Sequence, residues 1–316
     1  MISLRNNLAS VTLTLTVLFC IGGLPALTAP KWQDEEDSER RLWNKKFLTA
    51  RAKAKRPGGS PAPKTQPPAS ANQPVVQAGD SHGGPETEEV ADEQLIGITF
   101  WRLREATSRE LNSEKRLLLQ QKYIAGRVAA ETAFKRDDLV RLSIEAPRAE
   151  GAYLYVIDRE IYSDGSVGIP HLILPSRTVR NGDHEIIAGK VLDLPDSSDS
   201  IPYFSLSSDR ADYAGEQLTI IISPSPLNLG RSDGSPLPLN RDQVERLQEW
   251  ERDWTGPVEK REDRTQSGAN RTAIEKEASD GERLLTQRDP LPQTIYRVKA
   301  KAGGRLLISV PLRIGR

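Results

Sequence analysis

Cysteine is almost absent from this sequence, and that absence removes a set of chemistries. The only cysteine, Cys20, lies inside an apolar run near the N-terminus. If a signal peptidase removes this run, the remaining chain has no disulfide, no thiolate nucleophile and no cysteine metal site. Its stability must then come from the hydrophobic core alone.

An excess of charge of one sign is missing, and hydrophobic residues are few. The 44 Lys and Arg residues balance the 44 Asp and Glu residues, so the formal net charge is zero. No global field would attract nucleic acid or an anionic membrane surface. Only 37% of residues are hydrophobic and 5% aromatic, and the apolar ones gather mid-chain. We therefore predict a folded part well short of the full length, with no nucleic-acid partner.

Catalytic and cofactor-binding motifs are also missing. The sequence has no phosphate-cradling Gly-rich loop, Gly-x-Ser-x-Gly elbow, His-Glu-x-x-His or Cys-x-x-Cys. Of the three histidines, His171 and His184 could form a metal pair, or one could act as a general base with Asp183. Ordinary turn and strand-end positions are the favoured interpretation, because no second motif supports a site. We predict no catalytic residue, no metal and no cofactor.

Two groups of carboxylates allow further hypotheses. Asp158, Glu160 and Asp164 lie near one turn and could hold Ca²⁺, but Glu160 stands where the calcium loop has Asp or Asn. Asp193 and Asp196 could act as the carboxylate pair of a glycosidase. Spacing in sequence does not give separation in space, so turn chemistry is the favoured interpretation of both groups.

The N-terminal segment is typical of an export signal. Arg5 precedes an uncharged apolar run at 8–24, and the small residues of 25–29 suit signal peptidase. An uncut anchor is the alternative, because the run is close to the lower limit for spanning a bilayer. We expect cleavage and a location in the periplasm or cell envelope, or outside the cell. Only an uncut segment would contact the membrane.

Two segments before the folded part are distinguished by composition. Residues 30–56 are heavily charged, and a solvated spacer is favoured over a short amphipathic helix that would carry Trp43, Phe47 and Ala50 on one side. Residues 57–93 are rich in Pro, Gly and Ala. Such a segment cannot bury enough apolar surface to fold, so we predict a disordered linker.

The clearest structural signals lie in residues 94–227, the predicted β domain. Val140, Leu142 and Ile144 alternate with polar residues, the pattern of a half-buried strand. A second strand in 151–158 precedes an Asp-Gly turn, and further short apolar runs are bounded by turn residues. We predict a mainly β fold: one antiparallel sandwich-like domain with one or two short helices and long disordered segments.

The remainder of the chain is predicted to add a charged insertion and a hairpin. In residues 228–290 Asn240 would cap one helix from Arg241 to Trp254, and Glu259 to Arg283 would be disordered. Residues 291–316 would form a β-hairpin that joins the sheet, turning at two adjacent glycines.

Aromatic residues give the best indication of a binding surface. Tyr153 and Tyr155 share one face of their strand, and tyrosine combines a rigid apolar ring with a polar tip that suits peptide or glycan. Burial in the core is the favoured alternative for these two side chains. Trp250 and Trp254, at the end of the predicted helix, complete the candidate binding face.

The strand and turn motifs carry a resemblance to a known family. Residues 142–147 and 151–160, followed by Tyr162-Ser-Asp-Gly165 and Asn181-Gly-Asp183, resemble the bacterial domain-of-unknown-function family 4384 in its exported form. The similarity covers roughly residues 95–227, under half of the chain. It implies a β-rich module that accompanies kinase-like or peptidase-like domains in other chains and has no established activity. No catalytic residue is carried over.

Taken together, these patterns favour a non-catalytic module that binds another, unidentified envelope protein through a sheet face or edge. A glycan- or peptidoglycan-binding module that uses Tyr153 and Tyr155 is the alternative. A hydrolase that uses His171 or His184 is the least favoured hypothesis.

Overall fold

The computed structural model describes residues 31–52, 92–107, 123–129, 131–147, 151–179, 182–196, 199, 201–300 and 304–315. The predicted export segment and nearly all of the predicted linker lie outside these residues. The chain divides into two compact units, Met1–Glu39 and Arg40–Arg316. Of the first, only the beginning of helix α1 (Lys31–Ala52) is described. No helix among the described residues is long and apolar enough to cross a membrane.

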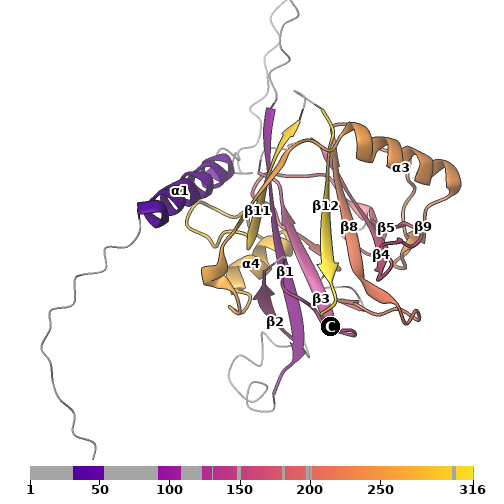
Figure 1. Ribbon diagram of the computed structural model, residues 1–316. Helices are drawn as coiled ribbons and strands as arrows, with labels where there is room; N and C mark the ends of the chain where they lie inside the picture. Colours follow the sequence, from indigo (N-terminus) through magenta and orange to yellow (C-terminus); the bar gives the residue numbers. More distant parts are fainter. Residues whose placement is uncertain are drawn as a thin grey trace, which may run out of the picture. The chain divides into compact units, whose positions relative to one another are not determined.

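The second unit is mainly β and contains two antiparallel sheets, as the sequence predicts (Figure 1). The first sheet has the order β10-β11-β1-β3-β6, with β2 paired to β1 and β7 paired to β3. Its strands are β1 (Asp92–Glu105), β2 (Tyr123–Val128), β3 (Leu139–Glu145), β6 (Leu192–Leu194), β7 (Phe204–Ser205), β10 (Val258–Glu262) and β11 (Thr294–Ala300). The second sheet has the order β12-β8-β4-β5-β9. Its strands are β4 (Tyr153–Tyr162), β5 (His171–Leu174), β8 (Tyr213–Ser223), β9 (Leu237–Pro238) and β12 (Leu306–Arg313).

Both sheets send alternate side chains into one hydrophobic core. Ile98 and Phe100 enter it from β1, and Leu218 and Ile220 enter it from β8. This alternation follows from the two-residue period of a strand, which directs successive side chains to opposite faces. The two sheets therefore pack face to face, with the core between them.

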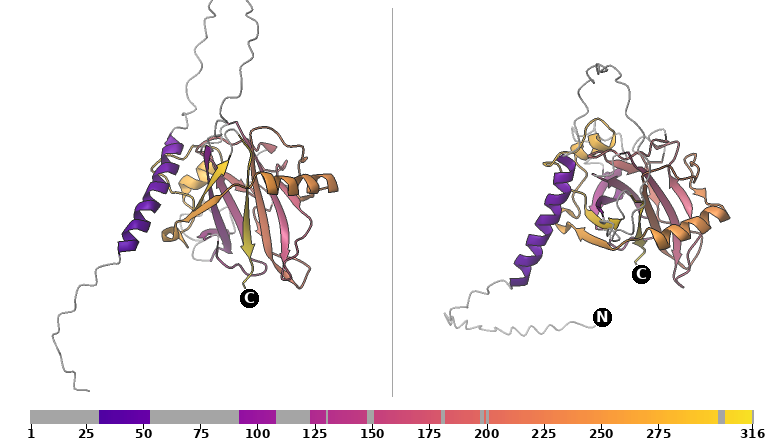
Figure 2. Two further views of the ribbon diagram at one scale, coloured as in Figure 1. Left: turned by 45° about the horizontal axis from the view of Figure 1, so that its top comes forward. Right: turned by 90° about the horizontal axis from the view of Figure 1, so that it is seen from above.

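Helix α3 (Arg241–Asp253) covers the outer face of the second sheet, away from the core (Figure 2). The Asn240 side chain accepts a hydrogen bond from the backbone N–H of Gln243, and the Gln243 side chain bonds back to the backbone of Asn240. This capping box satisfies two backbone donors that a helix start leaves free. Leu247 is buried against Ile221 and Leu307. The predicted helix is thus confirmed, with Trp254 as its C-cap.

The prediction that β3 is half-buried is wrong, because residues on both of its faces are buried. Arg141, Ser143 and Glu145 are buried like the apolar residues between them. Charged and polar groups from other segments cover this outer face of the first sheet. Polar residues on one face of a strand therefore do not show that this face is exposed, because buried partners can satisfy their hydrogen bonds.

The interpretation of residues 30–56 as a solvated spacer is wrong for the part that the structure describes. Residues 31–52 form α1, and Trp43, Phe47 and Ala50 are buried. Trp43 and Phe47 pack with Leu95 of β1 and Ile295 of β11. The apolar stripe at helical spacing was the correct signal, and the surrounding charges concealed it.

The predicted disorder between Glu259 and Arg283 is also wrong. This span contains most of β10, a 3₁₀ turn at Arg264–Gln266 and helix α4 (Ala273–Ser279). Thr272 and Glu275 form a capping box at the start of α4. Glu275 also forms a buried ion pair with Arg127 of β2. Partners that lie elsewhere in the chain therefore order a segment that has few apolar residues of its own.

The predicted C-terminal hairpin is replaced by two strands in different sheets. β11 lies between β10 and β1 in the first sheet, whereas β12 pairs with β8 in the second. Both strands were predicted, but their neighbours were not. Alternation of apolar and polar residues predicts a strand, but it does not predict which strand pairs with it.

Candidate functional site

The predicted tyrosine face is covered rather than free. Tyr153 and Tyr155 do lie opposite Leu154 and Val156, as the alternation predicts. However, Tyr155 is only 1% exposed, and its hydroxyl accepts a hydrogen bond of 2.7 Å from the backbone N–H of Leu227. Tyr153 is half-buried. Tyr155 is therefore a core residue, so its proposed direct contact with a ligand is wrong.

The two tryptophans of the predicted binding face help to hold α3. The rings of Trp250 and Trp254 stack with centroids 4.7 Å apart. Both rings pack against the apolar cluster that contains Tyr155 and Leu247. The guanidinium of Arg305 lies over the Trp254 ring, 5.0 Å from its centroid. Both rings are partly buried by these contacts. Packing alone therefore explains why tryptophans occupy the two positions, and no ligand is required.

The two histidines do not form a pair. The ring of His184 packs against Tyr155 with centroids 5.1 Å apart, and burial lowers its pKa. Its carbonyl accepts a hydrogen bond from Leu154, while His171 pairs in register with Asp158. Leu154 and Asp158 are four residues apart on β4, about 13 Å along a strand. A shared metal or a joint catalytic role is therefore excluded by position.

A groove opens between the two sheets. One cavity of about 450 Å³ is lined by residues of β1, β3, β4, β5, β7, β8 and β12, most of them apolar. A second cavity of about 530 Å³ continues it toward Thr178 and Asp199. We call the two cavities together the intersheet groove. They share four lining residues: Ile173, Phe204, Ser205 and Pro236.

Three carboxylates converge on the first cavity of this groove. Asp158 and Glu160 lie two residues apart on β4 and so share a face, and Glu216 of β8 pairs in register with Glu160. We call Asp158, Glu160 and Glu216 the acidic trio. The sequence did not single out Glu216. Its position could be found from the alternation of β8, because Leu218 and Ile220 share its face.

Hydrogen bonds link the members of the trio to two tyrosines and to each other. Tyr213 donates a hydrogen bond of 2.6 Å to Glu216 Oε1, and Tyr162 donates one of 2.7 Å to Glu160 Oε2. Glu216 is 8% exposed and Asp158 is half-buried. The carboxyls of these two residues hydrogen-bond each other when one of them is protonated, and no other described group donates to Glu216 Oε2 or Asp158 Oδ1.

Burial raises the pKa of two members of the trio. The pKa of Asp158 rises to about 7, mainly because burial disfavours its charged form and secondarily because of the charge of Glu160. The pKa of Glu216 rises to about 8, again through burial first and then through the charge of Asp158. At neutral pH the two carboxyls therefore retain protons that exposed carboxylates would have lost.

Cations near the groove are engaged elsewhere. Arg141 donates hydrogen bonds to the carbonyl of Pro202. Arg210 forms an ion pair with Asp212, and its guanidinium lies 3.6 Å from the centroid of the Tyr162 ring. Among the described residues, no Lys or Arg forms an ion pair with the acidic trio. Retained protons, rather than a described cation, therefore limit the negative charge of the trio.

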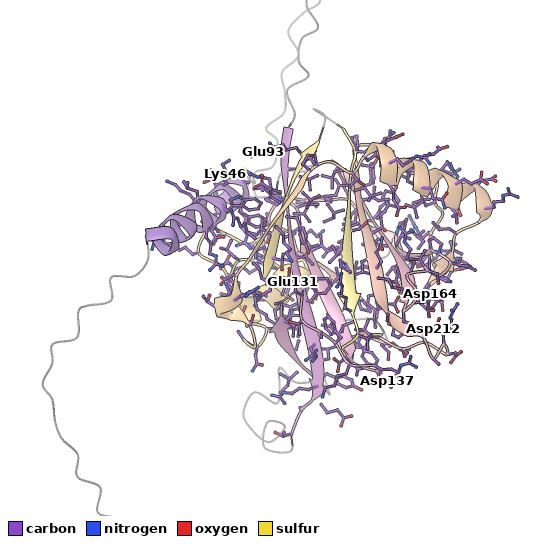
Figure 3. All side chains as sticks on the ribbon, viewed as in Figure 1. Lys46, Glu93, Glu131, Asp137, Asp164 and Asp212 are labelled. Atoms are coloured by element: carbon purple, nitrogen blue, oxygen red, sulfur yellow. The ribbon has the colours of Figure 1, made fainter. Side chains whose placement is uncertain are left out.

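The structure separates the carboxylates of the calcium hypothesis. Asp158 and Glu160 lie together, but Asp164 is on an exposed turn after β4, where its side chain accepts hydrogen bonds from Ser166. Figure 3 labels Asp164 and Asp212 at the surface. No cluster of three or more His, Cys, Asp or Glu side chains in the described structure could hold a metal ion.

The carboxylates of the glycosidase hypothesis have structural contacts instead. Asp193 is buried on the outer face of the first sheet, where it accepts a hydrogen bond from Ser143 and forms an ion pair with Arg271. The backbone N–H of Asp196 bonds to the side chain of Asp199. Asp193 is therefore a structural residue.

No protein-family model, curated protein or solved structure matches this chain. The resemblance to family 4384 stays a prediction from the sequence. Function can therefore be inferred only from the geometry of the intersheet groove.

Proposed function

We propose that this chain is a non-catalytic protein-interaction module of a bacterial cell envelope, which holds an extended segment of its partner in the intersheet groove. The observation that carries this proposal is the groove itself. Two adjoining cavities of about 450 and 530 Å³ share lining residues, among them residues of β7 and Pro236 next to the edge strand β9. An elongated ligand matches such a groove better than a compact one does.

Strand edges along the groove support an extended polypeptide as the ligand. β9 is the last strand of the second sheet, and β7 pairs only with β3 in the described structure. Phe204 and Ser205 of β7, and Pro236 next to β9, line both cavities. Edge strands offer backbone N–H and C=O groups to an added strand, while pockets beside them select its side chains.

Exposed apolar side chains on the groove support the same interpretation. Ile169 is 64% exposed and lines the first cavity, and Ile201 is 61% exposed and lines the second. Large apolar side chains are usually buried, and their grouping at the surface is typical of interaction sites. A partner that covers both isoleucines would recover the free energy of burying them.

Export is the second part of this proposal, and the N-terminal pattern supports it. The apolar run at 8–24 and the small residues of 25–29 would direct the chain across the membrane. The module would then meet its partner in the periplasm or at the cell surface.

Site-specific photocrosslinking in the bacterium that makes this protein tests the proposal. A photoreactive residue would replace Ile169 or Ile201, with Val258 of β10, which is 40% exposed, as the matched control. We expect the same protein to be captured from both groove positions, in the envelope fraction, and not from Val258. Equal capture from all three positions, or none from the groove, would contradict the proposal.

A sacculus-binding assay, performed beside the crosslinking, distinguishes glycan binding from protein binding. Purified protein that is retained by cell-wall sacculi, with no protein captured at Ile169 or Ile201, would replace the proposed partner with a glycan. Because Tyr155 is buried, the glycan would then have to bind elsewhere than the predicted tyrosine face.

A second candidate function, acid–base hydrolysis, is favoured by one observation. Asp158 and Glu216 have raised pKa values of about 7 and 8 in a cavity, and carboxyls that share protons can act as acid and base. Cleavage of the captured partner, abolished by Asp158→Asn, would establish this function. An intact partner after prolonged incubation would support binding alone.

A further inference from the structure

The first cavity of the intersheet groove, which has a volume of about 450 Å³, presents accessible apolar surface. Ile169 is 64% exposed, Phe204 of β7 is half-buried and Pro236 is exposed. Ile173 and Leu206 line the same cavity and are buried members of the hydrophobic core. A ligand that enters this cavity therefore meets mainly carbon atoms.

The carboxyls and phenols beside this cavity are engaged with one another. Tyr162 donates a hydrogen bond to Glu160, and Tyr213 donates one to Glu216. Asp158 and Glu216 hydrogen-bond each other when one of them is protonated. Oδ1 of Asp158 and Oε2 of Glu216 are buried. These two carboxyls are therefore not available to a ligand.

The other polar side chains that line the cavity are either engaged or reached by water. Arg141 is only 2% exposed and donates hydrogen bonds to the carbonyl of Pro202. His171 is half-buried, and Ser205 and Ser207 are exposed. The interior of the cavity, as far as the structure describes it, thus has no free polar partner for a ligand.

This lining selects against charged groups. An ion or a hydroxyl that enters the cavity gives up its hydrogen bonds to water and finds no replacement for them. The half-buried Glu160 would also repel an anion. An apolar group, in contrast, gains free energy when it leaves water.

The volume of the cavity matches an aromatic ring better than a small aliphatic group. An engineered apolar cavity of about 150 Å³ is sufficient to bind benzene. The first cavity is larger, so it has room for the ring of a Phe or Trp side chain. Phe204 lines both cavities, and its ring can form an offset-stacked or edge-to-face contact with such a ring.

We infer that the first cavity holds an uncharged aromatic side chain, Phe or Trp, of the partner segment, with its ring against Phe204 and Ile169. The backbone of the segment then lies beside β7, at the junction with the second cavity. This inference rests on the proposed function and names the side chain that anchors the partner.

NMR titration of the full chain with four small probes tests this selectivity. Toluene, benzylammonium and benzoate share a six-membered aromatic ring and differ in charge, and methylcyclohexane matches toluene in size without being aromatic. The δ1 methyl groups of Ile169 and Ile173, labelled with ¹³C and assigned by substitution to Val, report binding in the cavity. We expect toluene to bind at least about tenfold more tightly than either ion, and methylcyclohexane to bind more weakly than toluene.

Two exposed isoleucines provide a matched pair of variants. Ile169→Ala should weaken toluene binding about threefold, because part of the apolar contact is lost. Ile201→Ala is the control, since Ile201 is 61% exposed but lines only the second cavity, and it should leave toluene binding unchanged. Glu160→Gln should strengthen benzoate binding and leave toluene unchanged.

The anchor itself is identified on the captured partner. Mass spectrometry of the peptide crosslinked at Ile169 should find a Phe or Trp at or next to the crosslinked residue. Replacement of that aromatic residue by Ala in the partner should abolish capture, whereas replacement of a neighbouring charged residue should not.

The outcomes separate this inference from the proposed function. A captured partner without an aromatic residue at the crosslink would overturn the inference and leave the proposed function intact. Equal binding of toluene and either ion, equal binding of methylcyclohexane, or no binding of toluene would also overturn it. A lipid that co-purifies with the chain and blocks toluene would replace the aromatic side chain with an acyl chain. Toluene selectivity without any captured protein would overturn the proposed function.

Discussion

Two regions of this protein bury carboxylates, and they treat them differently. On the outer face of the first sheet each buried carboxylate has an arginine: Glu145 with Arg51, Glu275 with Arg127 and Asp193 with Arg271. In the intersheet groove, Asp158 and Glu216 lie together, and no arginine or lysine of the described chain pairs with either of them.

The difference separates carboxylates that an arginine neutralises from carboxyls that retain a proton. Arg51 forms two hydrogen bonds with Glu145, of 2.5 and 2.7 Å, and donates three more to the carbonyls of Thr286, Asp289 and Pro290. Such a site is complete and has no capacity for a ligand. In the groove, Asp158 and Glu216 hydrogen-bond each other instead, and burial together with the neighbouring carboxylates raises the pKa of both.

The largest effect is expected from breaking a complete pair. Arg51→Ala leaves Glu145 buried without a cation and should lower the free energy of unfolding by about 3–5 kcal/mol. Urea denaturation followed by circular dichroism measures this change. The control is Lys46→Ala, whose exposed pair with Glu93 should contribute less than about 1 kcal/mol. Equal effects of the two variants would show that burial of the Arg51–Glu145 pair does not matter.

A smaller effect should come from the hydrogen bonds behind Asp193. Ser143 accepts a bond from Trp101 Nε1 and donates one to Asp193 Oδ1. Ser143→Ala leaves both groups without this partner and should cost about 1–3 kcal/mol. The matched control is Ser309→Ala, an exposed serine on β12. A cost near zero for Ser143→Ala would contradict the account of this face.

Replacing a carboxyl of the groove should stabilise the protein at high pH, whereas the two substitutions above destabilise it. The pKa values of Asp158 and Glu216 are about 7 and 8, against ordinary values of 3.8 and 4.5. The folded chain therefore binds more protons than the unfolded chain between these limits, so this contribution to stability is greatest below pH 4 and is lost as pH rises to about 8. Glu216→Gln should flatten this dependence and raise stability at pH 8 by about 1–3 kcal/mol.

Urea denaturation at a series of pH values measures that response. Parallel curves for the wild-type chain and Glu216→Gln would show that Glu216 does not titrate in the groove. The reverse sign, a variant less stable at pH 8, would mean that the described chain already compensates its charge.

The smallest effect is expected when both members of a complete pair are replaced. Arg51→Met combined with Glu145→Leu removes the charges together and should change stability by about 1 kcal/mol or less. A double-mutant cycle with the two single variants measures the coupling of the pair. A double variant as unstable as Arg51→Ala would show that the carbonyl contacts of Arg51, rather than its charge, dominate.

Elements with a regular apolar period were predictable. The alternation on β4 correctly separated Tyr153 and Tyr155 from Leu154 and Val156. Asn240 correctly marked the start of α3. In these cases neighbours in sequence contain the whole signal, because the period of the backbone fixes which side chains share a face.

The charged segments were not predictable in the same way. The composition of the segments that form α1 and α4 predicts a solvated spacer and a disordered stretch, because charged residues dominate both. Their key partners are distant, since Arg51 and Glu145 are 94 residues apart and Arg127 and Glu275 are 148 apart. Nothing in the local sequence shows that a charge will meet its counterpart in the core.

The candidate site was visible only in part. Spacing in the sequence groups Asp158 and Glu160 with Asp164 as calcium ligands. The cross-strand register then placed Glu216 opposite Glu160 and left Asp164 on an exposed turn. Register depends on the pairing of strands that are far apart in sequence, so the trio could not be assembled from spacing alone.

Local repeats of apolar residues and one helix cap suffice to predict the mainly β class, the faces of the individual strands and the position of α3. They do not show which strands are neighbours, which charges are paired or which carboxyls retain a proton. Those features depend on contacts between distant segments, and the free energy of a buried charge is set by the groups that surround it in space.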